Sequence, residues 1–185
     1  MARTVAIYGG SFDPPHVAHV LVASYVLSTA EVDELWVIPT WEHPFAKHLN
    51  APFEARVEMC NLAFGLFERA RVLRTEGELG GVSRTLHTLE ELRRRDPDVA
   101  FRLVMGADLL SETDRWHAFD NVRTIAPPLV VGRAGHEHAE GSPFDFPAIS
   151  STDVRDRVQK GASVRGLIPH AVATYIERHQ LYRAR

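Results

Sequence analysis

The 185-residue sequence contains a single cysteine, Cys60, so no disulfide can form within the chain. Cys60 lies in an apolar, helix-like stretch, which predicts a small buried residue. No apolar run approaches the ~20 residues that a membrane span requires, and the N-terminus lacks the basic segment and long apolar run of a signal peptide. We therefore expect a cytoplasmic protein that does not insert into membranes.

Basic residues are not in excess. The chain has 21 Lys and Arg against 24 Asp and Glu, a net charge of -3. This balance argues against nucleic-acid binding, which usually requires a strongly basic face, although local cationic clusters could still bind a triphosphate. Internal repeats, low-complexity tracts and interdomain linkers are also lacking, so residues 1–185 are predicted to form one domain. The oligomeric state, a homo-oligomer included, stays open.

Short apolar runs alternate with longer helical patterns along the chain, which is typical of an α/β fold with a doubly wound, Rossmann-like parallel sheet. The predicted strands are residues 4–8, 35–38, 72–74, 101–105 and 129–131, and the predicted helices are residues 16–27, 52–68, 85–95, 150–160 and 169–180. Ligands of such sheets bind beyond the carboxyl ends of the strands. The segments that follow the strands should therefore converge on one crevice.

The first predicted strand leads into the sequence GGSFDPPHVAH, residues 9–19. Its two glycines allow a tight turn and a close approach of a ligand to the backbone. His16 and His19 open the next helix three residues apart, so they share a face beside a helix N-terminus, which favours phosphate. A histidine pair can also bind a metal, but no nearby cysteine or third ligand has metal-site spacing. We therefore expect no direct metal ligand.

A second motif, ISSTDVR, occupies residues 149–155. Hydroxyl side chains at a helix start, followed one turn later by Arg155, predict a second anion site. Taken alone, this pattern favours a capped helix with a solvated arginine. The combination with the first motif favours the anion site.

Together, the two motifs resemble those of the nucleotidyltransferase superfamily, which is marked by a His/Thr-x-Gly-His sequence. Within it, the chain resembles the bacterial nicotinate-nucleotide adenylyltransferases over nearly its whole length, since ISSTDVR matches their Ile-Ser-Ser-Thr-x-(Ile/Val)-Arg signature. Ala18 replaces the motif's glycine, and its extra methyl group would either crowd the nucleotide or shift the helix start. A further difference is HPFAK, residues 43–47, in place of a Pro-Pro-His-Lys run; Lys47 aligns with the lysine of that run.

The resemblance implies roles for individual residues. The ATP-binding residues would be Gly9, Gly10, Ser11, Phe12, His16, His19, Gly106, Asp108, Ser151, Thr152 and Arg155. Those acting directly on the reacting phosphates would be His16, His19, Lys47 and Arg155. The mononucleotide-binding residues would be Ser83, Thr85, Trp116 and Arg133. Thr85 would recognise the pyridine carboxylate, Trp116 would stack on the pyridine ring, and Arg133 would hold the mononucleotide phosphate. Without the resemblance, Trp116 is equally typical of core packing.

The implied activity is the transfer of AMP from ATP to nicotinate mononucleotide, which yields nicotinate adenine dinucleotide and pyrophosphate in NAD biosynthesis. Mg²⁺ would be bound through the ATP phosphates. Three alternatives stay open: an enzyme that uses nicotinamide mononucleotide, a phosphopantetheine adenylyltransferase, and a non-catalytic nucleotide-binding regulator. Phosphopantetheine enzymes generally carry threonine in place of the first motif histidine, which here is His16.

Overall fold

Five parallel strands form the sheet of the computed structural model, which describes residues 3–42, 49–110, 113, 116–132 and 146–183. The strands are β1 (Thr4–Gly10), β2 (Glu34–Pro39), β3 (Ala70–Val72), β4 (Ala100–Gly106) and β5 (Pro128–Val131). Their order in the sheet is β3-β2-β1-β4-β5, with every neighbouring pair parallel. The predicted doubly wound α/β fold is confirmed.

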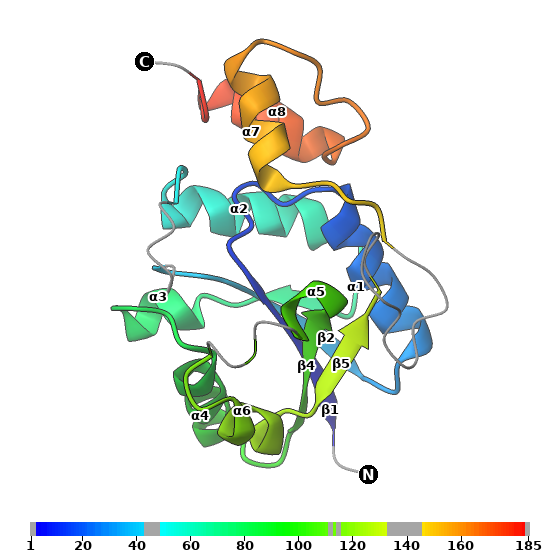
Figure 1. Cartoon of the computed structure of the whole chain (residues 1–185), viewed down its shortest axis with the longest axis vertical. Coiled ribbons are helices and arrows are strands. Elements are labelled where there is room, and N and C mark those ends of the chain that lie inside the picture. The colour runs from blue at the N-terminus through cyan, green and yellow to red at the C-terminus, as the bar shows by residue number, and fades with distance from the viewer. Residues whose placement is uncertain (1–2, 43–48, 111–112, 114–115, 133–145, 184–185) are drawn as a thin grey trace.

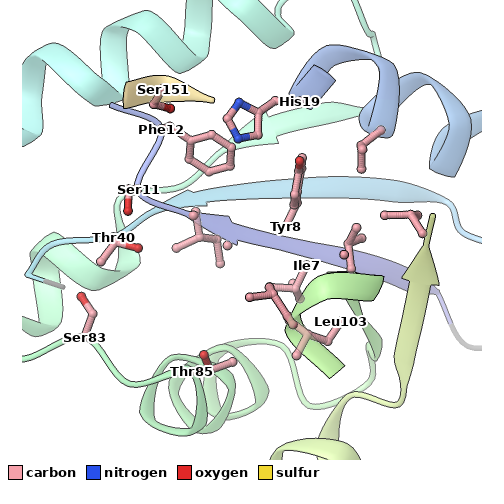
Figure 2. Close-up of a pocket in the computed structure, with 18 of the residues that line it drawn as sticks. Ile7, Tyr8, Ser11, Phe12, His19, Thr40, Ser83, Thr85, Leu103 and Ser151 are labelled. Carbon is pink, nitrogen blue, oxygen red and sulfur yellow. The ribbon is translucent and has the colours of Figure 1, made fainter. Parts of the chain in front are cut away.

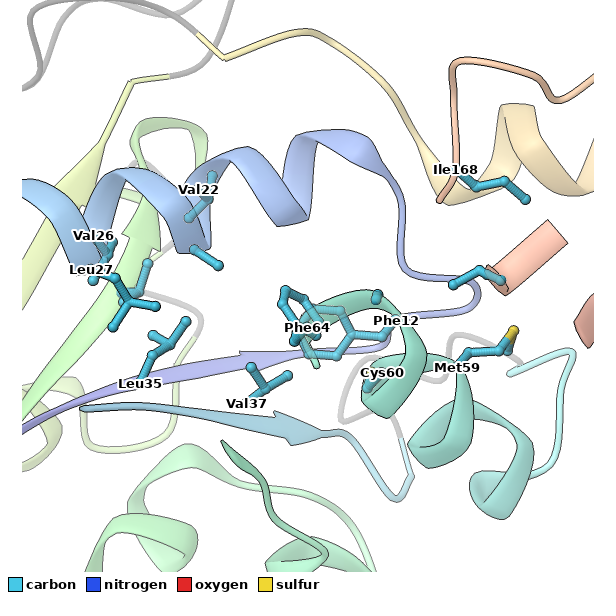
Figure 3. Close-up of a cluster of buried hydrophobic side chains, with 14 of the residues drawn as sticks. Phe12, Val22, Val26, Leu27, Leu35, Val37, Met59, Cys60, Phe64 and Ile168 are labelled. Atoms are coloured by element: carbon cyan, nitrogen blue, oxygen red, sulfur yellow. The ribbon is translucent and has the colours of Figure 1, made fainter. Parts of the chain in front are cut away.

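Helices cover both faces of the sheet (Figure 1). They are α1 (Val17–Thr29), α2 (Phe53–Phe64), α3 (Thr75–Leu79), α4 (Thr85–Arg95), α5 (Ala107–Leu110), α6 (Phe119–Ile125), α7 (Ser151–Gln159) and α8 (His170–Arg178). Alternate strand residues face opposite sides, since Ala6 joins one buried cluster whereas Val5 and Ile7 join another. The first cluster packs the sheet against α1 and α2 (Figure 3), and the second packs it against α4 and α6.

Cys60 lies fully buried in the first cluster, as predicted, and burial raises its thiol pKa well above the ordinary value. The apolar surroundings therefore keep this thiol protonated and unreactive.

Two predicted boundaries were wrong. The helix expected over residues 52–68 ends at Phe64, and the strand expected over residues 72–74 is β3, Ala70–Val72. Pairing explains the second shift, because Ala70 aligns with Leu35 and Val72 with Val37 of β2. The helices α3, α5 and α6 were not predicted; each is only 4–7 residues long.

The carboxyl ends of the strands lead into the segments that the sequence predicted to converge. β1 lies at the centre of the sheet, between β2 and β4, so the loop that follows it lies beside the topological switch point. Among the described residues, no helix combines the length and apolar character needed to cross a membrane.

Candidate active site

The loop between β1 and α1 is shaped by Phe12, whose backbone has a φ of 44°. A non-glycine residue in this left-handed region carries strain that persists only where the surroundings fix it. The Phe12 ring is 1% exposed and makes edge contacts with the rings of Tyr8, His19 and Phe64 at centroid separations of 5.0–5.7 Å. Aromatic packing thus holds the bend of the loop.

The two glycines before this bend matter because they lack a side chain, not because they adopt an unusual backbone conformation. Gly9 and Gly10 belong to β1, and neither has a positive φ. The expectation that they form the tight turn was therefore wrong; the bend falls at Phe12. A Cβ atom on Gly10 would lie 3.1 Å from Cζ of Phe12, whereas one on Gly9 would meet no atom within 4 Å. Gly9 leaves open space where the strand reaches the cavity described below.

His16 and His19 stand together at the start of α1, with ring centroids 3.6 Å apart and the rings nearly parallel. The backbone N–H of His16 donates to Nδ1 of His19 at 3.1 Å. This bond places the His19 proton on Nε2, where it can donate to a ligand oxygen. His16 is 6% exposed and both side chains line the cavity.

The start of α7 is joined to the same loop, although the two segments lie more than 130 residues apart. Ser151 Oγ donates to the carbonyl of Pro14 at 2.8 Å, and Arg155 Nη1 donates to the carbonyl of Asp13 at 2.7 Å. Ser150 caps the helix, since its Oγ accepts from the N–H of Asp153 at 3.1 Å. The N–H groups of the first helical turn lack partners within the helix, so this end of α7 can bind an anion.

Arg155 contributes to the site mainly by holding the loop. Besides its bond to Asp13, its Nη2 donates to Oγ1 of Thr152 at 3.1 Å. Thr152 and Ser151 line the cavity, whereas Arg155 lies behind them and is not part of its wall. The Ser151 hydroxyl hydrogen is committed to Pro14, so its oxygen is available as an acceptor.

A cavity of about 780 Å³ opens at the carboxyl ends of β1 and β4, between the start of α7 on one side and α4 on the other (Figure 2). In Figure 2, His19, Phe12 and Ser151 lie on one side of β1, and Thr85 and Leu103 lie on the other. Of the residues predicted from the sequence, those lining the cavity are Gly9, Gly10, Ser11, Phe12, His16, His19, Ser83, Thr85, Gly106, Trp116, Ser151 and Thr152. The predicted convergence of these distant segments on one crevice is confirmed.

Thr85 and Trp116 occupy the part of the cavity that borders α4. Thr85 is the first residue of α4, so the unpartnered N–H groups of that helix start lie beside it. Trp116 lines the cavity and also packs against the second core cluster, with its ring 5.8 Å from that of Phe119. It is partly buried, so it combines core packing with an aromatic surface in the cavity wall. Ser83 is 7% exposed, and its hydroxyl accepts from the N–H groups of Trp41 and Glu42 at 3.0 and 3.2 Å, so it orders the loop.

Glu76 on α3 is a cavity-lining residue that the sequence did not indicate. Its carboxylate accepts from the N–H of Trp41 and from the hydroxyl of Thr88, both at 3.1 Å, and it also contacts the Ser83 hydroxyl. Burial raises the pKa of Glu76, and these hydrogen bonds oppose that rise. Glu76 thereby links the segment after β2 to Ser83, which precedes Thr85, and to Thr88, which follows it.

Arg56 is a second residue whose contacts the sequence did not reveal. It is 1% exposed and donates to three backbone carbonyls, those of Ser11, Trp41 and Ala51, at 3.0, 3.4 and 3.2 Å. Burial lowers its pKa, and the nearby Asp13 carboxylate opposes that change. Arg56 is therefore a scaffold residue, because its guanidinium holds the loops after β1 and β2 together.

Three predicted site residues have no described side chain. Lys47 and Arg133 lie outside the described residues, and Asp108 lies in α5 with only its backbone described. Their assignments therefore stay predictions.

Comparison with known proteins gives a consistent result. Residues 7–157 match the cytidylyltransferase-like family model. A protein of Anaeromyxobacter sp. (strain K), named "Probable nicotinate-nucleotide adenylyltransferase", is 48% identical over 184 residues, covering 98% of this chain and 97% of the relative. A protein of Myxococcus xanthus with the same name is 37% identical, covering 98% and 95%.

The fold has counterparts among solved structures. The Plasmodium falciparum nicotinic acid mononucleotide adenylyltransferase complexed with NaAD superposes with a TM-score of 0.80 at 20% identity, covering 97% of each chain. Sequence identity over the full length and the paired motifs around one cavity lead to the same assignment. The chain belongs to the nicotinate-nucleotide adenylyltransferase family, within the cytidylyltransferase-like nucleotidyltransferases.

Proposed function

We propose that this chain transfers the adenylyl group of ATP to nicotinate mononucleotide, forming nicotinate adenine dinucleotide and pyrophosphate. The observation that carries the proposal is the joining of the histidine-bearing loop after β1 to the hydroxyl-bearing start of α7 at one cavity. Full-length similarity to relatives of that name supports the choice of substrates. The continuous cores on both faces of one sheet support a single domain over residues 1–185.

The reaction would be an in-line attack of the mononucleotide 5'-phosphate on the α-phosphorus of ATP. A new P–O bond forms to the attacking oxygen while the bond to the β-phosphate oxygen breaks and pyrophosphate leaves. The attacking phosphate is already anionic at neutral pH, so no general base is required. The protein must supply positioning and charge stabilisation.

Residues of the cavity wall would divide this work. Nε2 of His19 would donate to a phosphate oxygen, and His16 would orient the α-phosphate region. The N–H groups at the start of α7, at Ser151 and Thr152, would bind the β- and γ-phosphates. Arg155 would add positive charge from behind while holding the loop. We also propose that Lys47 closes over the phosphates.

The mononucleotide would occupy the part of the cavity bordered by α4. The helix start at Thr85 would bind the pyridine carboxylate, and Trp116 would stack on the pyridine ring. Arg133 would hold the mononucleotide phosphate. A carboxylate is favoured over an amide at a helix N-terminus because only the carboxylate carries a charge that the helix dipole stabilises.

Mg²⁺ would enter with ATP. It usually retains several water ligands and binds through substrate phosphates, so it needs few protein ligands. The oxygen of Ser151, whose hydrogen is directed to Pro14, fits as an acceptor for metal-bound water. When bound, the ion would neutralise the charge that develops on pyrophosphate.

A pyrophosphate-release assay with ATP and Mg²⁺ tests the proposal. Nicotinate mononucleotide, nicotinamide mononucleotide and 4'-phosphopantetheine are supplied in parallel. We expect the highest kcat/KM with nicotinate mononucleotide. Preference for the amide would reassign the acceptor, release with phosphopantetheine alone would replace the pyridine assignment, and ATP binding without release from any acceptor would indicate a regulator.

A further inference from the structure

The segment after α8 reaches back to the loop between β1 and α1. The hydroxyl of Tyr182 donates to Oδ1 of Asp13 at 2.7 Å, across 169 residues of sequence. Sequence patterns assigned no individual role to Asp13 within its motif and none to Tyr182. Their contact connects the segment after α8, which lies outside both signature motifs, with the histidine-bearing loop.

Asp13 is 2% exposed, and among the described residues each of its carboxylate oxygens has two hydrogen-bond donors. Oδ2 accepts from the backbone N–H and the side-chain amide of Asn50 at 2.7 and 3.3 Å. Oδ1 accepts from the N–H of Ala51 at 3.1 Å and from Tyr182. A buried carboxylate is stable in one position only while such bonds are made. Loss of the phenol would leave Oδ1 with half of its partners.

The backbone of the last described segment is bent to deliver this phenol. Gln180 and Tyr182 both adopt left-handed conformations, with φ of 54° and 63°. Bulky residues rarely adopt this region, and the strain persists where surrounding contacts fix it. Burial and the neighbouring Asp13 carboxylate raise the pKa of Tyr182, which keeps the phenol protonated as a donor.

Asp13 also lies where the second motif, at the start of α7, is hydrogen-bonded to the loop. Its backbone carbonyl accepts from Arg155, and the carbonyl of the next residue, Pro14, accepts from Ser151. The side chain of Asp13 is thus fixed by Tyr182 and its backbone by α7. A shift of this residue would move the adjoining loop, which carries Phe12 into the cavity and leads to His16.

We propose that Tyr182 is a positioning residue for the ATP-phosphate end of the cavity, acting through Asp13. This inference rests on the proposed function for the identity of the ligand. It predicts a selective effect: ATP binding depends on the Tyr182 hydroxyl, whereas the mononucleotide end, which borders α4 on the other side of β1, does not.

Tyr182→Phe removes the one oxygen that makes this bond and keeps the ring. We expect ATP–Mg²⁺ binding in calorimetric titration to weaken, and the KM for ATP to rise, by about tenfold, because small displacements of a phosphate-binding loop cost at least this much. The KM for nicotinate mononucleotide should stay within about twofold of the wild-type value. The matched control is Tyr175→Phe on α8, where Tyr175 packs against His179 at a ring separation of 4.2 Å. This control should leave ATP binding unchanged.

Three results would overturn the inference. They are an unchanged ATP affinity in Tyr182→Phe, an equal rise in both KM values together with a lower Tm, and an equal loss of ATP affinity in Tyr175→Phe. The second result would indicate a merely structural role. A wild-type protein that binds ATP but releases no pyrophosphate would contradict the proposed function alone, because the titration still measures the effect of Tyr182.

Discussion

Replacing Gly9 by alanine should weaken ATP binding without lowering the stability of the fold. Gly9 has no positive φ, and a Cβ atom there would meet nothing within 4 Å, so the folded protein can accept the methyl group. The substitution lowers the entropy of the unfolded chain and should stabilise the protein by about 0.4–1 kcal/mol, or roughly 1–4 °C in Tm. The same methyl group would occupy cavity space beside the bound nucleotide, so KM for ATP should rise about tenfold or more.

The neighbouring glycine provides the matched comparison. A Cβ atom on Gly10 would lie 3.1 and 3.2 Å from two atoms of the Phe12 ring, which is tighter than ordinary contact. That ring cannot yield freely, because Tyr8, His19 and Phe64 pack against it. Gly10→Ala should therefore destabilise the protein by about 1–3 kcal/mol and lower the Tm by roughly 2–12 °C.

Thermal unfolding and pyrophosphate-release kinetics on the two variants measure both quantities. The expected pattern is opposite in sign for stability: Gly9→Ala melts at or above the wild-type temperature, and Gly10→Ala melts below it. A Gly9→Ala protein with a normal KM for ATP would refute the placement of the nucleotide against the end of β1. A Gly10→Ala protein with an unchanged Tm would refute the claim that the Phe12 ring is fixed.

Three further changes test other parts of the site. His19→Ala should lower kcat by about two orders of magnitude or more with an unchanged circular-dichroism spectrum, because a donor to the reacting phosphates is lost; near-normal turnover would exclude this role. Arg56→Leu leaves three backbone carbonyls without their donor and removes the cation near the buried Asp13 carboxylate, so unfolding should need about 3–5 kcal/mol less. A Tm within about 2 °C of wild type would contradict the scaffold role. Burial raises the pKa of Glu76 in the folded protein above its usual 4.5. Protonated Glu76 therefore stabilises the folded state below pH 4.5, and this stabilisation is lost as the pH rises through the folded-state pKa. Glu76→Gln does not titrate, so its Tm relative to wild type should increase between pH 4.5 and 7; a pH-independent difference would show that the carboxyl is not perturbed.

The sequence predicted the sheet and the converging segments because both depend on local patterns. Mainly apolar runs such as residues 101–105 predict buried strands. The motif residues directly follow the ends of such strands. Helix α7 was predicted from the hydroxyl residues at its start, since a capping serine, here Ser150, acts within its own helix start. These features need no knowledge of distant parts of the chain.

The parts that were missed depend on distant or weak signals. The bonds of Asp13 to Asn50 and Tyr182 join residues 37 and 169 positions apart, which no periodicity reveals. Helix α3 has only five residues, among them Gly77, so its pattern is too short to predict a helix that delivers Glu76 to the cavity. The turn was assigned to the glycines because positive φ is usual for glycine, whereas Phe12 adopts it here through ring packing.

The contacts of the loop fit the proposed binding of a triphosphate. Backbone carbonyl oxygens carry partial negative charge and would repel phosphate if they faced it. The carbonyls of Ser11, Asp13 and Pro14 each accept a hydrogen bond, from Arg56, Arg155 and Ser151 respectively.

Two of these donors are cations, so they draw carbonyl dipoles toward themselves and add positive potential around the loop. The orientation is fixed during folding, which spares the loop a rearrangement when ATP binds. Arg56 and Arg155 therefore share an electrostatic function, although one is buried in α2 and the other lies on α7 more than ninety residues later.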